Sequence, residues 1–513
     1  MTTRSMISIG NKSFVPASSP YFLALYLCSK STVSASSARS DSSFSFPCLR
    51  FAARIKESLL HSLSLSILSG VILTLTALAI RNGQRLRMEC IADISMNSAL
   101  AEFEKTLHDR YELFYVDLSY QEAKPSLQNM ERRLQYYLSE NIALFQNSDL
   151  WGNLALKNVE VNDVQTAADG QGGSMKNQAV QYIEDCGIHR EETEILSSGD
   201  SILGTGQEDA MGAWCALMEE IAGMELPLIQ NDKGEWEEVP LSNPADRAYG
   251  FTGSDVLFLV GAPIDRIPVG KIRKEDYLSG RDSGDRSDLQ GQKEADTGQF
   301  IAYLFEMMGN YRSGREDGLL KYQLEYIAEG KGSDYENLQA VVEKLTGIRF
   351  AVNAEAVFSD GDLVSEAAGL AEGLQAVSLN PAFLKPVTES ILYACAYLEA
   401  LSEVKVLLEG GRVSLRKERW VIRPAMIAEA EIQRGQNISS GISYEQYLAG
   451  MISALPEKER NYRAMDIMEM DIRMLTGNTG FAMDCCVERF RAQIQAAGSV
   501  RGNYLIDRTY GYY

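Results

Sequence analysis

The segment Leu59–Ile80 contains no Asp, Glu, Lys or Arg, and this constrains the fold more than any other feature of the chain. As a helix, its 22 residues extend about 33 Å, enough to cross a hydrocarbon core of about 30 Å. Six Ser and Thr side chains make it only moderately hydrophobic. We therefore predict a transmembrane helix over residues 58–81, with a buried core helix as the alternative.

Charge is distributed unevenly on either side of this segment. The 513 residues carry a net charge of -21. Residues 1–57 contain seven basic and two acidic residues, so the tail carries +5 and the remainder -26. This asymmetry favours a tail inside the cell and a body outside, although three basic residues flank the segment on each side. An acidic body also argues against nucleic acid as a partner.

The Ser-rich tail over residues 1–57 permits several interpretations. Its composition resembles an organelle transit peptide. It is equally consistent with a disordered tail, or with an upstream extension from a misplaced start codon. We predict disorder and exclude the tail from the fold.

The residues that follow Ile80 favour continuation of the same helix. No Gly or Pro occurs between Arg85 and Arg110. Apolar and small residues recur at three- and four-residue steps, which predicts one helix from about Leu59 to about Leu107, roughly 70 Å long. The residues expected to pack on the body are Met88, Ile91, Ala99, Phe103 and Leu107, whereas Glu102 and Glu104 are expected to face water. This pattern fits a pilin-like spine, or a juxtamembrane helix on its own domain.

The body shows both helical and strand periodicity, so we predict the α+β class: a transmembrane helix that continues into an amphipathic helix, packed on a mixed body with a C-terminal β-hairpin. Strands are expected at "YELFYVDLSY", "LALKNVEVNDVQTA" and "GSDVLFLVGAP", and a hairpin at "GGRVSLRKERWVI". The polar segment Ser279–Gly298 is expected to be a mobile loop. The predicted divisions are 82–277, with the stalk helix and a first α+β region, a loop at 278–298, and a mainly helical region at 299–513.

Three stretches resemble an uncharacterised family of membrane-anchored proteins from Clostridia and other Firmicutes, encoded beside tight-adherence (Tad) pilus and type II secretion-like genes. They are "RMECIADISMNSALAEFEKTLHDRYELFYVD", "LLKYQLEYIAEGKGSDYENLQAVVEKLTGIRFAVNAEAVFSD" and "ILYACAYLEALSEVKVLLEGGRVSLRK". In the first stretch the matching positions are Glu89, Cys90, Ala92, Asp93, Glu102, Leu107, Arg110, Tyr111, Leu113, Phe114 and Asp117. The resemblance implies other pilus or secretion components as partners. The span lacks the usual acidic residue before Arg81 and the features of a processed prepilin, so we do not expect cleavage.

Residues suited to chemistry are sparse. The eight cysteines form no CxxC pair, and there are only three histidines. We therefore predict no catalytic, cofactor-binding or metal-ligating residue and no cofactor. One cluster of polar residues is predicted to form a structural network. In it, Asp334 is expected to cap a helix, and Arg349 is expected to pair with a carboxylate on the strand that contains Glu325. The members of the cluster are Glu325, Asp334, Asn337, Arg349, Asn353 and Asp360.

These observations lead to one preferred hypothesis and two alternatives. The preferred one is a non-enzymatic, single-pass membrane protein, held in the lipid bilayer by residues 59–80, with an extracytoplasmic body that serves a Tad-like pilus or secretion apparatus. A membrane-tethered hydrolase of cell-wall or surface polymers would need two carboxylates converging in a cleft. An organelle-targeted soluble protein would need a functional transit peptide, which N-terminal sequencing would reveal.

Overall fold

The computed structural model describes residues 47–121, 124–145, 153–194, 207–273, 295–427, 432–499 and 502–512. The chain divides into two units, Met1–Leu75 and Thr76–Tyr513, which are described separately. The expected α+β class and the C-terminal hairpin are confirmed. Residues 1–46 of the tail, and the expected loop as far as residue 294, lie outside the described residues. The end of that loop, Thr297 and Gly298, already belongs to a helix.

Helix α1 (Pro47–Leu100) contains the uncharged segment. It begins before residue 58, so residues 47–57, expected to be disordered, are helical. It is the one helix among the described residues that is long and apolar enough to cross a membrane. Its most apolar window has a mean hydropathy of 2.2, and none of that window is buried.

The expectation that this helix continues to Leu107 is wrong, because α1 ends at Leu100 and α2 (Lys105–Tyr111) follows after a short turn. One tertiary contact and one local capping contact lie at the break. The hydroxyl of Tyr512, near the C-terminus, donates to the carbonyl of Leu100. The extended residue Glu104 caps α2, and its carboxylate accepts from the amide of Thr106 at 3.2 Å.

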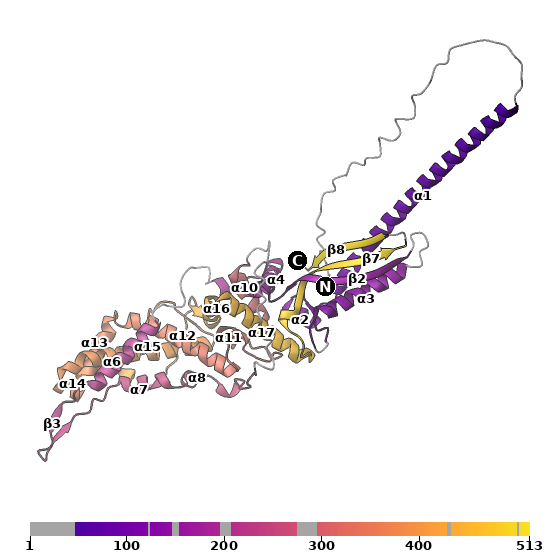
Figure 1. Ribbon diagram of the computed structural model, residues 1–513. Helices are drawn as coiled ribbons and strands as arrows, with labels where there is room; N and C mark the ends of the chain where they lie inside the picture. Colours follow the sequence, from indigo (N-terminus) through magenta and orange to yellow (C-terminus); the bar gives the residue numbers. More distant parts are fainter. Residues whose placement is uncertain are drawn as a thin grey trace, which may run out of the picture. The chain divides into compact units, whose positions relative to one another are not determined.

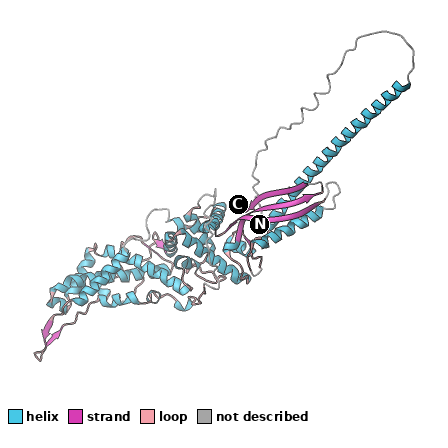
Figure 2. Cartoon of the chain, viewed as in Figure 1, coloured by secondary structure: helices cyan, strands magenta, loops and turns pink. Residues whose placement is uncertain are grey.

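A four-stranded antiparallel sheet packs on the last turns of α1 (Figures 1 and 2). Its strands are β1 (Val116–Asp117), β2 (Leu154–Thr166), β7 (Cys486–Gly498) and β8 (Gly502–Gly511). The long strand β7 pairs with β2 on one side and with β8 and β1 on the other. One face of the sheet, the C-terminal part of α1 and helix α3 (Leu127–Phe145) together enclose an apolar core.

The rest of the second unit is mainly helical and has its own larger core. Its longest helices, α12 (Asp334–Val357) and α15 (Leu384–Leu408), pack on each other. The other helices of more than six residues are α4 (Asp169–Cys186), α6 (Gln207–Gly223), α10 (Thr297–Met307), α11 (Gln323–Glu329), α13 (Gly361–Glu372), α16 (Tyr444–Ala454) and α17 (Glu457–Thr476). The shorter elements are α5 (Glu191–Glu194), α7 (Ala245–Gly250), α8 (Val256–Leu259), α14 (Gln375–Leu379) and the strand pairs β3 (Leu228–Gln230) with β4 (Trp236–Glu238) and β5 (Arg412–Val413) with β6 (Ile442–Ser443).

Several expected strands are not strands in the structure. The apolar run "VLFL" forms α8, started by the side chain of Asp255, which accepts from the amide of Leu257 at 2.9 Å. Glu325 lies on helix α11. The expected hairpin after Gly410 is absent, because β5 pairs with the distant strand β6. Short apolar runs do not distinguish a strand from a buried helix, so tertiary packing decided each case.

Candidate functional site

The residues expected to line the stalk helix fall into two different cores. Met88, Ile91 and Ala99 are fully buried on α1 and pack in the core of the sheet region. Leu107 is also fully buried, but it lies on α2 and belongs to the core of the helical region. Phe103, in the turn between the helices, is half-buried, and its ring lies 5.2 Å from that of Phe114.

The two acids expected to face water are engaged instead. Glu104 caps α2, and Glu102 accepts from the hydroxyl of Tyr137 at 2.7 Å. Sequence reasoning also missed Gln84, which is fully buried on α1 and donates to the hydroxyl of Ser499 at 2.8 Å. A Cβ on Gly498 would lie 2.3 Å from the side-chain oxygen Oε1 of Gln84, so glycine at the end of β7 leaves room for the Gln84 side chain.

The six residues predicted as one polar network do not form a single network, and among them Arg349 and Asn353 share a partner. Asp360 caps α13, as its carboxylate accepts from the amides of Asp362 and Leu363, both at 3.1 Å. Asn337 accepts from the amide of Lys331 at 2.6 Å and closes the turn before α12. These side chains stabilise local chain geometry.

Asp334 does not cap α12, contrary to prediction. The cap is Ser333, and Asp334 is the first residue of the helix. Its carboxylate instead accepts from the amides of Lys321 and Tyr322, at 3.0 and 2.8 Å. Burial raises the pKa of Asp334, and these amide donors oppose that rise. Asp334 therefore fixes the chain that leads into α11.

Glu325 is fully buried on α11 and does not pair with Arg349, so that prediction is also wrong. One carboxyl oxygen accepts from the hydroxyl of Tyr444 at 2.7 Å and from the amide of Tyr311 at 2.8 Å. The other oxygen has no hydrogen-bond partner among the described residues. Desolvation raises the pKa of Glu325 to about 7. An acid with this pKa changes charge near neutral pH.

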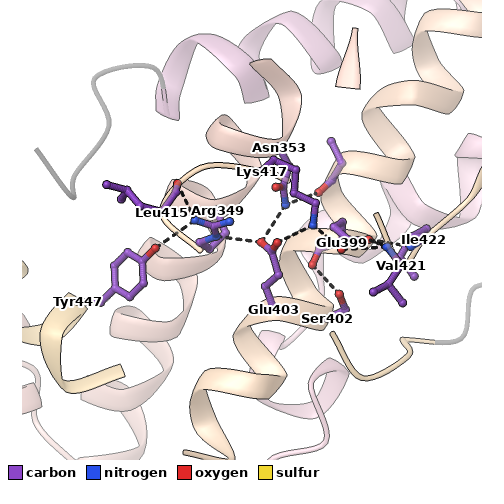
Figure 3. A network of polar contacts seen from close by, with 11 residues as sticks. Arg349, Asn353, Glu399, Ser402, Glu403, Leu415, Lys417, Val421, Ile422 and Tyr447 are labelled. Atoms are coloured by element: carbon purple, nitrogen blue, oxygen red, sulfur yellow. Dashed lines mark hydrogen bonds and ion pairs between the residues drawn. The ribbon is translucent and has the colours of Figure 1, made fainter. Parts of the chain in front are cut away.

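Arg349 and Asn353, both on α12, converge on Glu403 of α15 (Figure 3). The Glu403 carboxylate accepts from Arg349 Nε at 2.9 Å and from Asn353 Nδ2 at 3.0 Å. Arg349 also donates to the hydroxyl of Tyr447 at 3.1 Å. Although burial favours the neutral acid, Arg349 and Lys417 hold the pKa of Glu403 below its usual value.

Lys417 extends this network to a second acid one turn earlier on α15. Its ammonium group lies 2.7 Å from Glu403 and 2.5 Å from Glu399 (Figure 3). Glu399 also accepts from the amides of Val421 and Ile422, at 3.0 and 2.7 Å. Two carboxylates thus balance two cations, and the segment around Lys417 is held against α15. The available sequence signal was a pair of glutamates four residues apart in an apolar helix.

A second buried cluster joins α2 to α17 and was not predicted. Asp471, almost fully buried, accepts from Arg110 Nε at 3.0 Å, from the hydroxyl of Tyr111 at 2.7 Å and from Gln323 Nε2 at 2.7 Å. The other Arg110 nitrogens contact Asp471 at 2.8 Å and Asp317 at 2.7 Å. The amide of Leu319 also donates to Asp471 at 2.9 Å, so α2, the segment before α11 and α11 itself all meet α17 at this carboxylate.

The grooves formed by the described residues of the second unit include the following three. One of 690 Å³ lies between α4 and α10 and includes Glu184, His189 and Asp296. A second groove of 730 Å³ runs along α12, and a third groove of 530 Å³ lies beside α6 and α7. Asp296 caps α10 through the amide of Gln299 at 2.9 Å. Across the described ranges, no group of three or more His, Cys, Asp or Glu side chains is arranged to hold a metal ion.

Comparison with known proteins gives one match. Residues 234–498, just over half of the chain, match the family described as "Family of unknown function (DUF5702)". No curated protein and no solved structure matches the chain. The matched region contains the network of Arg349, strand β7 and Asp471, whereas α1, α3, β2 and the helix α2 that donates to Asp471 precede it.

Proposed function

The chain belongs to the DUF5702 family, and from that premise we propose that it is a membrane-anchored, non-catalytic component of a Tad-like pilus or secretion apparatus. Its acidic body lies outside the membrane. Other components of the apparatus are its partners. The family itself assigns no activity, so the proposal rests on the physical character of the chain and on the resemblance of its first helix to a pilin-like spine.

The change of environment along helix α1 carries this proposal. Side chains from Leu59 to Leu78 are largely exposed, including nine large aliphatic residues at Leu60–Leu75. From Met88 onward the same helix contributes fully buried residues to the core of the sheet region. An exposed apolar surface of this size requires lipid or an apolar partner. A helix whose first half is exposed and apolar and whose second half packs in the body is suited to a subunit that is anchored in the membrane.

The chemistry of the buried charges supports a non-catalytic role. Glu399 and Glu403 are both buried, and their oxygens are occupied by Lys417, Arg349 and backbone amides. A carboxylate so engaged is neither a free general base nor a nucleophile. This network is consistent with a structural function, in which it stabilises the body of an assembly subunit.

Membrane insertion is tested first. The full chain should remain in the membrane pellet after alkaline extraction. Leu68→Arg combined with Leu75→Arg should release it, because each arginine near a helix centre costs about 2.5–3.5 kcal/mol. Leu86→Arg, on the polar part of α1, is the matched control. Release of the wild-type chain would overturn the anchor.

Topology and role are tested in native cells. Protease added to intact protoplasts should digest the region after Arg81, and protection of the body would overturn the orientation. Deletion of the gene should abolish surface filaments or secretion, with restoration by wild type and by Leu86→Arg. Normal filaments and secretion in the deletion strain would remove the assembly role.

One observation favours the alternative of a membrane-tethered hydrolase. Glu184, His189 and Asp296 all line the groove of 690 Å³. A groove of this volume can hold a short segment of a polymer. Release of soluble fragments from purified cell wall by the full chain, abolished in Glu184→Gln, would favour this function. No release by the wild type would leave the groove without a hydrolytic role.

A further inference from the structure

The small hairpin formed by β3 and β4 exposes two large apolar side chains. Figure 1 shows β3 extending away from the neighbouring helices. Trp236 is 68% exposed and Leu228 is 56% exposed. Leu228 pairs with Glu238 and Gln230 with Trp236, which places all four side chains on one face of the hairpin. Leu228 and Trp236 therefore form a single apolar patch.

The hairpin is internally stabilised, which keeps this patch in place. The side-chain oxygen of Asn231 accepts from the amides of Lys233 and Glu235, at 3.0 and 2.9 Å. Its amide group donates to Glu237 at 2.8 Å. Below the strands, the amide of Val239 donates to the carbonyl of Pro227 at 2.8 Å. An isolated two-stranded hairpin is only marginally stable in water. These hydrogen bonds therefore stabilise a hairpin that has few buried side chains.

An apolar groove of 530 Å³ begins at the base of the same hairpin. Leu226, two residues before β3, and Pro240, two residues after β4, both line it. The remaining apolar lining includes Met218, Ile221, Met224 and Leu241. Methionine side chains adapt to ligands of varied shape. The patch and the groove are thus adjacent along the chain, and together they are called the hairpin surface.

Carboxylates surround the hairpin surface. Residues 218–246 contain eight Asp and Glu but a single Lys. Of the eight, Glu219 and Asp246 line the groove, and Glu237 and Glu238 lie on β4. None of the eight forms an ion pair with a Lys or Arg that the structure describes. An apolar centre with an uncompensated acidic rim is complementary to a partner with apolar side chains and flanking cations.

We propose that the hairpin surface docks a cationic, amphipathic segment of a partner protein. Apolar side chains of the segment pack on Trp236 and Leu228 and enter the groove. Its Lys or Arg side chains meet the carboxylate rim, and one cation stacks on the Trp236 ring. The outer edges of β3 and β4 have no strand partner among the described residues, so the segment can also add as a strand. This surface does not depend on membrane insertion or on the assembly role.

Binding is measured with the full chain in nanodiscs of uncharged lipid, with empty nanodiscs as the blank. The probe is a short fluorescent peptide of alternating Lys and Leu, and the matched peptide has Glu in place of Lys. The Lys peptide should bind and should weaken as salt rises, because the rim is exposed. Equal binding of the Glu peptide would overturn the charge complementarity.

Variants locate the binding. Trp236→Ala, and Glu219→Lys with Glu238→Lys, should each weaken binding of the Lys peptide about tenfold. The controls are Phe258→Ala, an aromatic residue that is 74% exposed on α8, and Glu355→Lys with Glu372→Lys on α12 and α13. Equal losses in the controls, or unchanged binding in Trp236→Ala with an unchanged melting temperature, would overturn the proposal. Loss of binding together with a lowered melting temperature is resolved by Trp236→Phe, which should retain most of the binding.

Discussion

The sheet region and the helical region of the second unit are held together in different ways. The core of the sheet region is built from aliphatic, aromatic and small side chains of α1, α3 and the long strands. The helical region also has an apolar core, but buried ion pairs such as Arg349–Glu403 and Arg110–Asp471 cross it. Apolar contacts tolerate small changes of shape, whereas a buried charge requires its own partner. Charge substitutions should therefore damage the helical region most.

The largest effect is expected from Glu403→Gln. The substitution leaves Arg349 and Lys417 without this carboxylate in a buried site, which costs about 3–5 kcal/mol when one member of a buried pair is removed. Denaturant unfolding of the full chain measures the change. Glu409→Gln, which breaks the exposed pair with Arg434, is the control and should cost about 0–1 kcal/mol. Equal effects would mean that the buried network is no more important than a surface pair.

The next effect depends on pH and concerns Glu325. Its pKa is raised from 4.5 to about 7, so between these values the folded protein binds more protons than the unfolded chain. The contribution of Glu325 to stability is therefore greatest below pH 4.5 and falls as the pH rises to about 7, by roughly 2–3 kcal/mol.

Glu325→Gln should remove that decline, so the variant should gain stability relative to wild type above pH 7. Urea unfolding between pH 4 and pH 8 checks this prediction, with the exposed Glu355→Gln as the control. A wild-type profile that rises over this range in the same way as the Glu325→Gln profile would contradict the raised pKa.

In the sheet region, Ala99→Leu should cost about 1–3 kcal/mol, because Ala99 is fully buried where α1 meets the sheet core and additional methyl groups overpack it. Thermal unfolding measures this loss. Ala101→Leu, at an exposed position just after the helix, is the control and should change little. If Ala99→Leu also leaves the melting temperature unchanged, the end of α1 packs loosely. The difference in packing between the sheet region and the helical region would then be smaller than described.

The smallest effect is expected at the turn between α1 and α2. Glu104→Ala removes the cap of α2 and should cost about 1 kcal/mol, whereas Glu104→Gln keeps a capping oxygen and should cost less. Denaturant unfolding of both variants gives the difference. Identical values near zero would show that the carboxylate contributes nothing to ending α1 at Leu100.

Elements with a long, regular pattern were predictable from the sequence. Strand β2 and the β7–β8 hairpin lie where the alternation of apolar and polar residues places them. Short segments were not predictable, since "VLFL" forms a helix and β5 finds its partner beyond an intervening loop. The site residues show the same contrast. Arg349 and Asn353 were expected in a polar network, but their partner Glu403 lies on another helix, and Glu325 contacts different side chains.

The sequence by itself determined the uncharged helix, the acidic body and the α+β class, because these depend on composition and on periodicity within one segment. Only the tertiary structure decided where α1 ends, which carboxylate pairs with which cation, and that Trp236 is exposed. Each of these depends on atoms brought together from distant parts of the chain. The free energy of a buried charge or of a helix end depends on the residues packed around it, and these residues cannot be identified from the local sequence.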